Sequence, residues 1–122
     1  MQSIVDLANN TRVYDVASVT PLSLAHQLSA RTKNNIYLKR EDELAIHAFK
    51  LRGAYQKISG LTKEQMAKGV VASSAGNHAQ GVALSASKLG IESVIVMPLS
   101  TPKIKVNAVE QLGGKVVLHG DV

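Results

Sequence analysis

Apolar residues in the second half of the chain follow two different spacings. Short runs in which every residue is apolar occur at 70–72, 94–97 and 116–118. Between these runs, apolar residues recur every three or four positions over 79–89 and 104–112, which is the spacing of one helical face. Strands that are apolar throughout and alternate with helices are typical of a parallel sheet. The pattern predicts an α/β fold in which right-handed crossovers place flanking helices on both faces of that sheet.

The first half of the chain has a weaker pattern. Alternating, β-favouring residues predict a strand at 35–39, and helical spacing from Phe49 predicts a helix that ends near Gly60. Thr62 is suited to cap a short helix that follows. Two more short helices are predicted at 4–7 and 22–30.

The composition narrows the class of protein. With 122 residues and 45% hydrophobic content, the chain can bury one modest core. It has no cysteine, and its four histidines lack the spacing of metal ligands, so we expect no metal site. The start of the chain has no signal-like segment, and no apolar run approaches the ~18 residues of a membrane span. We therefore expect a cytoplasmic protein without a membrane partner.

The formal net charge of +5 raises the question of a nucleic-acid partner. The lysines, however, stand singly among polar residues, and one Phe with three Tyr offers few rings on which bases stack. Solvated helix faces account for such a distribution of charge. We expect no nucleic-acid partner.

A turn after the strand at 70–72 carries polar side chains. In open α/β sheets, ligands bind beyond the carboxyl ends of the strands, where helix amino termini present free N–H groups. Gly76 would let a ligand approach the backbone, while Ser74 and Asn77 offer side-chain hydrogen bonds. The helix dipole favours an anion such as a carboxylate. The alternative is an ordinary turn in which Asn77 caps the helix.

Lys50 is a candidate catalytic residue because it stands in the first turn of the helix predicted from Phe49. The positive end of the helix dipole and the nearby Arg52 disfavour a protonated amine there, which suits a lysine that forms a Schiff base. The alternative is a solvated surface lysine. The charged residues at 39–42 are interpreted as a solvated loop, with a charge network near a site as the other option.

Two motifs combine these candidates. The lysine motif of the serine and threonine dehydratases resembles residues 47–55, HAFKLRGAY, and the asparagine loop of that family resembles residues 74–81, SAGNHAQG. Both occur in the family's order and at about its separation. Shorter segments similar to the biosynthetic threonine dehydratases are KRED at 39–42, VMP at 96–98 and LHG at 118–120. The resemblance covers most of the chain from Val13 onward and implies the tryptophan-synthase-β-like fold (fold type II), with pyridoxal phosphate between two α/β domains.

The resemblance also implies roles for individual residues. Lys50 would bind pyridoxal phosphate covalently and move the substrate's α-proton, as the catalytic residue. Phe49 would pack near the pyridine ring, and Asn77 would form a hydrogen bond with the cofactor's phenolic oxygen. The residues that would receive the substrate's carboxylate are Ser74, Ala75, Gly76 and His78.

The activity implied by the resemblance is the dehydration and deamination of L-threonine to 2-oxobutanoate and ammonia, the entry to isoleucine biosynthesis. Whether L-serine is also a substrate stays open, and full-length relatives are expected to be homo-oligomers. One departure lies in the lysine motif, where Ala48 stands in place of the usual serine.

Larger departures concern parts that the resemblance places beyond Val122: a glycine-rich loop for the cofactor phosphate, a serine for the pyridine nitrogen and a regulatory domain. We therefore expect residues 1–50 to be an amino-terminal segment that packs partly on a large domain absent from this chain. Residues 51–122 are expected to be part of an incomplete small α/β domain. The alternative function is that of an inactive remnant or a fragment that binds a partner.

Overall fold

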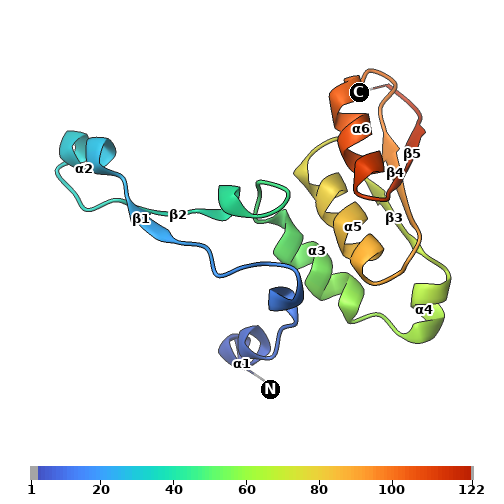
Figure 1. Cartoon of the computed structure of the whole chain (residues 1–122), viewed down its shortest axis with the longest axis horizontal. Coiled ribbons are helices and arrows are strands. Elements are labelled where there is room, and N and C mark those ends of the chain that lie inside the picture. The colour runs from blue at the N-terminus through green and yellow to red at the C-terminus, as the bar shows by residue number, and fades with distance from the viewer. Residues whose placement is uncertain (1–2, 122) are drawn as a thin grey trace.

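The computed structural model describes residues 3–121 (Figure 1). An amino-terminal part, residues 3–49, precedes the α/β unit, which we define as residues 50–121. The elements in chain order are α1 (Ile4–Asn9), η1 (Val13–Asp15), β1 (Leu22–Leu24), α2 (His26–Thr32), β2 (Tyr37–Lys39), η2 (Glu41–Glu43), α3 (Lys50–Ser59), α4 (Lys63–Ala67), β3 (Val70–Ser73), α5 (Asn77–Lys88), β4 (Ser93–Met97), α6 (Lys103–Gln111) and β5 (Lys115–Leu118).

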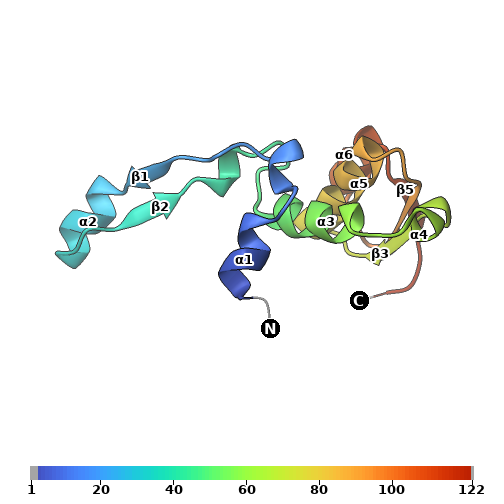
Figure 2. The same ribbon diagram turned by 90° about the horizontal axis from the view of Figure 1, so that it is seen from below.

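The α/β unit contains a parallel sheet in the strand order β3-β4-β5, as the apolar runs predict. Its register pairs Val70 with Ser93 and Val94 with Lys115. Helices α5 and α6 connect the strands and pack against the sheet (Figures 1 and 2). Ile95 and Val109 are almost fully buried at the centre of this packing. The predicted helix and strand boundaries in this half are confirmed to within a few residues.

The prediction that helices cover both faces of the sheet is wrong for residues 3–121. Val71 and Val117 point away from the buried cluster and are 75% and 40% exposed. The strand order explains the difference, because β3, β4 and β5 follow one another in a single direction across the sheet. Successive right-handed crossovers in one direction place both helices on the same face. We call the other face, which includes Val71, Val94, Val96 and Val117, the open face.

Residues 18–43 form an arm that extends away from the α/β unit (Figures 1 and 2). Strands β1 and β2 pair antiparallel, with Leu22 opposite Lys39, and α2 lies at the tip. The predicted helix at 22–30 is therefore wrong in its first half, since Leu22–Leu24 is a strand and the helix begins only at His26. Pairing with β2 is a long-range interaction, and it overrides the local helical spacing.

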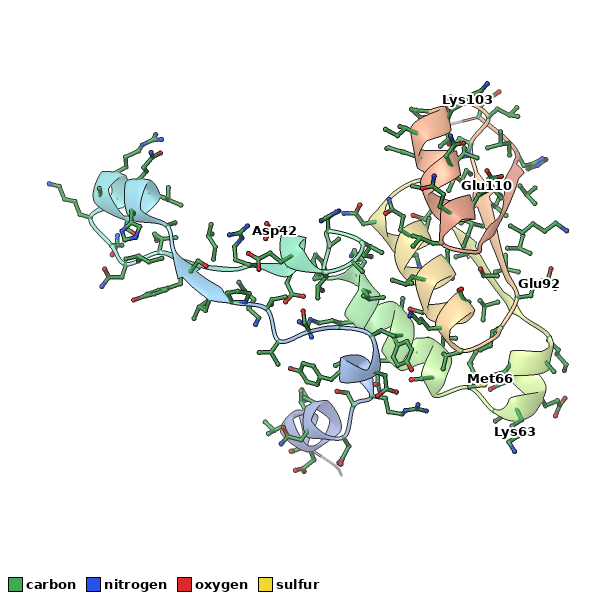
Figure 3. All side chains as sticks on the ribbon, viewed as in Figure 1. Asp42, Lys63, Met66, Glu92, Lys103 and Glu110 are labelled. Carbon is green, nitrogen blue, oxygen red and sulfur yellow. The ribbon has the colours of Figure 1, made fainter. Side chains whose placement is uncertain are left out.

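The chain between the arm and α3 is anchored by alternating buried residues. Leu44, Ile46 and Ala48 are buried, whereas the residues between them are exposed. His47 adopts a left-handed backbone conformation with φ of 52°, and its Nδ1 lies 2.9 Å from the carbonyl oxygen of Asp42. Asp42 stands at the base of the arm (Figure 3). This segment brings the chain to the start of α3.

Candidate active site

Lys50 is the first residue of α3, and Phe49 precedes it as the cap residue. The buried face of this helix is formed by Leu51, Ala54, Tyr55 and Ile58. Lys50 lies off that face and is exposed, as is Phe49 at 59%. The Nζ atom of Lys50 lies 4.6 Å from the centre of the Phe49 ring, within the range of a cation–π contact. The amine is therefore accessible and has an aromatic ring beside it.

The charge of Arg52, two residues after Lys50, is paired with Glu41. Its Nε and Nη2 atoms donate to the two carboxylate oxygens of Glu41 at 2.7 and 2.9 Å. Thr20 donates a further hydrogen bond to Glu41 at 2.6 Å. The hydrogen bonds from Arg52 and Thr20 lower the pKa of Glu41 to about 2.

The solvated-loop interpretation of residues 39–42 is therefore wrong for Glu41, whose side chain is only 17% exposed. Arg52 also donates to the carbonyl oxygen of Ser18 at 3.1 Å, so the pair ties the base of the arm to the first turn of α3. Nothing in the local pattern marks Glu41 among its charged neighbours. The signal that identifies it is the distant Arg52, eleven residues later.

The turn between β3 and α5 has the polar geometry that its sequence predicts. The backbone N–H of Ser74 donates to the carbonyl oxygen of Val96 at 3.1 Å, which attaches the turn to the neighbouring strand. The N–H of Gly76 donates to the Ser74 hydroxyl at 3.3 Å. Ala75 completes the turn and packs against the core cluster.

Helix α5 begins at this turn without a side-chain cap. The cap residue is Gly76, and Asn77 is the exposed first residue of the helix, so the interpretation of Asn77 as the cap is wrong. The N–H groups of the first turn have no side-chain cap, as an anion site requires. A Cβ built at Gly76 would meet nothing within 4 Å, so no other part of the described chain occupies the space beside it.

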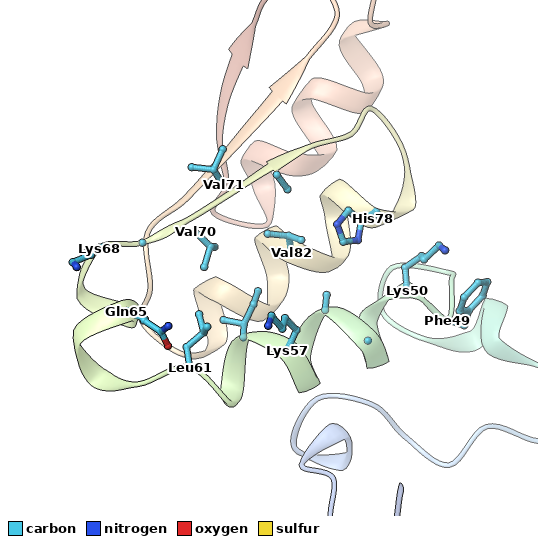
Figure 4. Close-up of a pocket in the computed structure, with 15 residues that line it drawn as sticks. Phe49, Lys50, Lys57, Leu61, Gln65, Lys68, Val70, Val71, His78 and Val82 are labelled. Atoms are coloured by element: carbon cyan, nitrogen blue, oxygen red, sulfur yellow. The ribbon is translucent and has the colours of Figure 1, made fainter. Parts of the chain in front are cut away.

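A cavity of about 690 Å³ lies between α3, α4, β3 and α5. Lys50, Phe49 and His78 line it, and Figure 4 shows Lys50 and His78 near the same end. Ser74, Ala75, Gly76 and Asn77 do not belong to its lining, although they adjoin His78 in the sequence. The structure therefore brings three of the seven predicted site residues to one cavity and leaves the other four outside its lining.

The cavity lining is apolar with a positive rim. Three lysines and no carboxylate belong to the lining; besides Lys50 they are Lys57 and Lys68. Positive charge around an apolar cavity favours an anionic ligand with an uncharged ring or chain. Among residues 3–121, no group of three or more His, Cys, Asp or Glu side chains is placed to hold a metal ion. No helix of the described part is long and apolar enough to cross a membrane.

Comparison with known families gives the same assignment as the two motifs. Residues 13–122 match the model of a family described as pyridoxal-phosphate dependent enzyme. The chain belongs to this family. The residues around the cavity fit the cofactor, because an exposed amine and an aromatic ring lie together at one end and two further lysines belong to the lining. Those residues suit a phosphorylated aromatic aldehyde.

The chain is similar to the amino-terminal part of several longer proteins. It is 60% identical over 111 residues to the biosynthetic L-threonine dehydratase IlvA of Pasteurella multocida, covering 91% of this chain and 22% of that protein. It is 56% identical over 108 residues to the corresponding Escherichia coli protein, covering 88% of this chain and 21% of the relative. The chain thus spans about a fifth of the length of these relatives.

Solved structures show the same fold. The processed form of threonine deaminase isoform 2 from Solanum lycopersicum superposes with a TM-score of 0.91 at 52% identity, covering 98% of this chain and 34% of that one. Maize serine racemase superposes with a TM-score of 0.85 at 37% identity, covering 91% of this chain and 33% of that one. The predicted fold class, a fold type II α/β arrangement present only in part, is confirmed.

Proposed function

We propose that this chain is the amino-terminal part of a threonine dehydratase that converts L-threonine to 2-oxobutanoate and ammonia. The observation that carries the proposal is the exposed Lys50 amine at the start of α3, on the cavity that His78 also lines. The names of both relatives support the same activity. Serine is a second candidate substrate, since the chain also resembles serine racemase in structure.

Each site residue then has a chemical task. When bound, pyridoxal phosphate supplies the electron sink for removal of the α-proton. Lys50 would hold the cofactor covalently through its Nζ atom and afterwards hold or move a proton there. Phe49, whose ring centre lies 4.6 Å from that amine, would pack near the pyridine ring. Asn77 would donate to the cofactor's phenolic oxygen.

The substrate's carboxylate is assigned to the start of α5. Ser74, Ala75, Gly76 and His78 surround the uncapped N–H groups there, and the helix dipole favours a negative charge. The open space beside Gly76 supports this assignment, because a carboxylate could approach the backbone without meeting another part of the described chain.

The division into domains is part of the same proposal. Residues 1–50 form a segment that packs partly on a large domain, and residues 51–122 belong to the small domain. Exposed apolar side chains support a covering partner for the first segment; on the arm they are Val19, Leu22, Leu28, Tyr37 and Leu38. In the α/β unit the open face is also exposed, with Val71 75% exposed, which supports a domain that covers this face. Assembly into a homo-oligomer and a cytoplasmic location stay predictions.

A chimeric enzyme tests the proposed activity. Residues 1–122 replace the matching region of the Pasteurella multocida relative, and 2-oxobutanoate is measured with L-threonine as substrate. We expect turnover in the chimera, lowered about 10³-fold or more by Lys50→Ala. Lys63→Ala, on α4 outside the cavity lining, is the matched control and should leave the rate unchanged. A folded chimera that binds the cofactor but produces no 2-oxobutanoate would contradict the proposal.

We expect the isolated chain to be catalytically inactive, as the alternative of an inactive fragment implies. The cofactor phosphate needs several converging N–H donors, and the sequence has no glycine-rich loop to supply them. Lys50 and Phe49 at the end of the cavity are also exposed, so water reaches the reacting amine. We expect the purified chain with pyridoxal phosphate and L-threonine to form no more 2-oxobutanoate than its Lys50→Ala variant. Turnover near the median for enzymes, about 10 per second, would contradict this.

A further inference from the structure

A glycine of α5 lies directly against the backbone of the candidate lysine. Gly81 is buried, and a Cβ built on it would lie 3.2 Å from the carbonyl oxygen of Lys50 and 3.3 Å from its carbonyl carbon. The same Cβ would lie 3.4 Å from the backbone nitrogen of Leu51. All three atoms belong to the first peptide group of α3. Since a peptide group cannot rotate away as a side chain can, a methyl group at this position would displace the start of α3 by a few tenths of an ångström.

Both sides of this contact are held in the core. On α5, the Ser85 hydroxyl is fully buried and donates to the carbonyl oxygen of Gly81 at 2.6 Å. On α3, Leu51 is fully buried among Ile46 and Ala48. Neither helix can therefore slide freely to accommodate an added atom. The separation of the two helices at this point is set by the absence of a side chain at Gly81.

The contact also connects the two motifs. Residues four apart in a helix lie on the same face, so Gly81 stands one turn below Asn77. His78 and Val82 occupy the neighbouring face and line the cavity together with Lys50. A change in helix separation at Gly81 therefore changes the distance between the lysine and the amino terminus of α5.

We propose that Gly81 is a positioning residue that sets the place of Lys50 relative to the turn at Asn77. This inference rests on the proposed function, because it assigns Gly81 a task only if Lys50 binds the cofactor. Gly60 provides a matched control on the same helix. It is the cap residue at the carboxyl end of α3, outside the cavity lining, and a Cβ built on it would meet the carbonyl oxygen of Gln56 at an ordinary contact distance of 3.5 Å.

The test compares Gly81→Ala and Gly60→Ala with the parent sequence, all three in the chimeric enzyme that retains the rest of the Pasteurella multocida relative. Each protein is treated with pyridoxal phosphate, reduced with borohydride and digested, and the pyridoxyl label on Lys50 is divided by the label on Lys57. Both lysines belong to α3 and line the cavity, so general loosening of the helix affects both. We expect Gly81→Ala to lower the ratio on the order of threefold, scaled from the effect of a 1 Å misplacement. Gly60→Ala should leave the ratio as in the parent.

The outcomes separate the two proposals. A parent chimera without preference for Lys50 over Lys57 would contradict the proposed function. A parent with that preference, together with an unchanged ratio in a folded Gly81→Ala variant, would overturn the role of Gly81 alone. Circular dichroism at the labelling temperature establishes whether each variant is folded.

If Gly81→Ala does not fold, a measurement on the parent tests the contact between Gly81 and Lys50. In the ¹⁵N-labelled parent, attachment of the pyridoxyl group to Lys50 should shift the amide resonance of Gly81. The same treatment of Lys50→Ala, in which Lys57 can still react, should not shift it. A Gly81 resonance that does not respond to the Lys50 label would mean that Gly81 does not contact the backbone of Lys50 in solution. That result would overturn the proposal.

Discussion

Replacement of Glu41 by glutamine should destabilise the chain in a pH-dependent way. The carboxylate accepts two hydrogen bonds from Arg52 and one from Thr20, and these lower its pKa from an ordinary value of 4.5 to about 2. A difference of this size corresponds to about 3 kcal/mol of stability at neutral pH. The two side chains are 17% and 23% exposed, so solvent screening reduces this contribution. We expect Glu41→Gln to cost about 2 kcal/mol at pH 7.

The sign of the pH dependence follows from the lowered pKa. A carboxyl group whose pKa is lower in the folded state stabilises the fold fully above its unfolded pKa, here about 4.5. This stabilisation is lost as the pH falls through the folded value of about 2. The difference between parent and Glu41→Gln should therefore be about 2 kcal/mol at pH 7 and mostly gone at about pH 2.5.

Urea unfolding of both proteins at several pH values measures this difference. Glu64→Gln is the control, since the Lys68–Glu64 pair is 73% and 82% exposed and should cost less than about 1 kcal/mol. A Glu41→Gln cost that is the same at pH 7 and pH 2.5 would refute the reasoning, because it could not come from the carboxylate charge. A cost equal to that of Glu64→Gln at pH 7 would show that the pair contributes no more than an exposed one.

Three further substitutions test the packing by urea unfolding at pH 7. Gly114→Ala should cost about 1–3 kcal/mol, because a Cβ there would lie 2.8 Å from Val109 Cγ1 and 2.9 Å from the Cβ of Ala83; a neutral result would mean that the core gives way easily. Gly53→Ala should instead stabilise the chain by about 0.5–1 kcal/mol, since its Cβ meets nothing and alanine favours the helix; a loss of stability would contradict this. Val71→Lys on the open face should change stability by less than about 0.5 kcal/mol, and a large cost would show that this face is covered in solution.

The local pattern of the sequence was sufficient for most elements of the α/β unit. Apolar runs and helical spacing predicted β3, α5, β4, α6 and β5, and Thr62 was correctly expected to cap α4. These features depend on residues close together in the chain. The strand at Leu22–Leu24 was missed because it exists only through pairing with Tyr37–Lys39, which local spacing does not reveal.

Some features of the candidate site could likewise be predicted from the local sequence, and others could not. Lys50 and the turn at Asn77 were identified from short motifs, since a lysine at a helix start and a glycine-containing turn are local features. The pairing of Glu41 with Arg52 was missed, because many surface charges have a similar local sequence and only the fold brings these two together. The contact of Gly81 with Lys50 joins residues on two helices and likewise has no local signature.

Local spacing is enough to assign the helices and strands of the α/β unit, and two short motifs are enough to indicate the family. The arrangement of those segments, including the placement of α5 and α6 on one face of the sheet, is evident only in the folded chain. The reason is physical: hydrophobic spacing reports whether a segment has a buried face, but it contains no information on strand order. Strand order and the direction of the crossovers determine which face the helices cover, and here they leave Val71 and Val117 exposed.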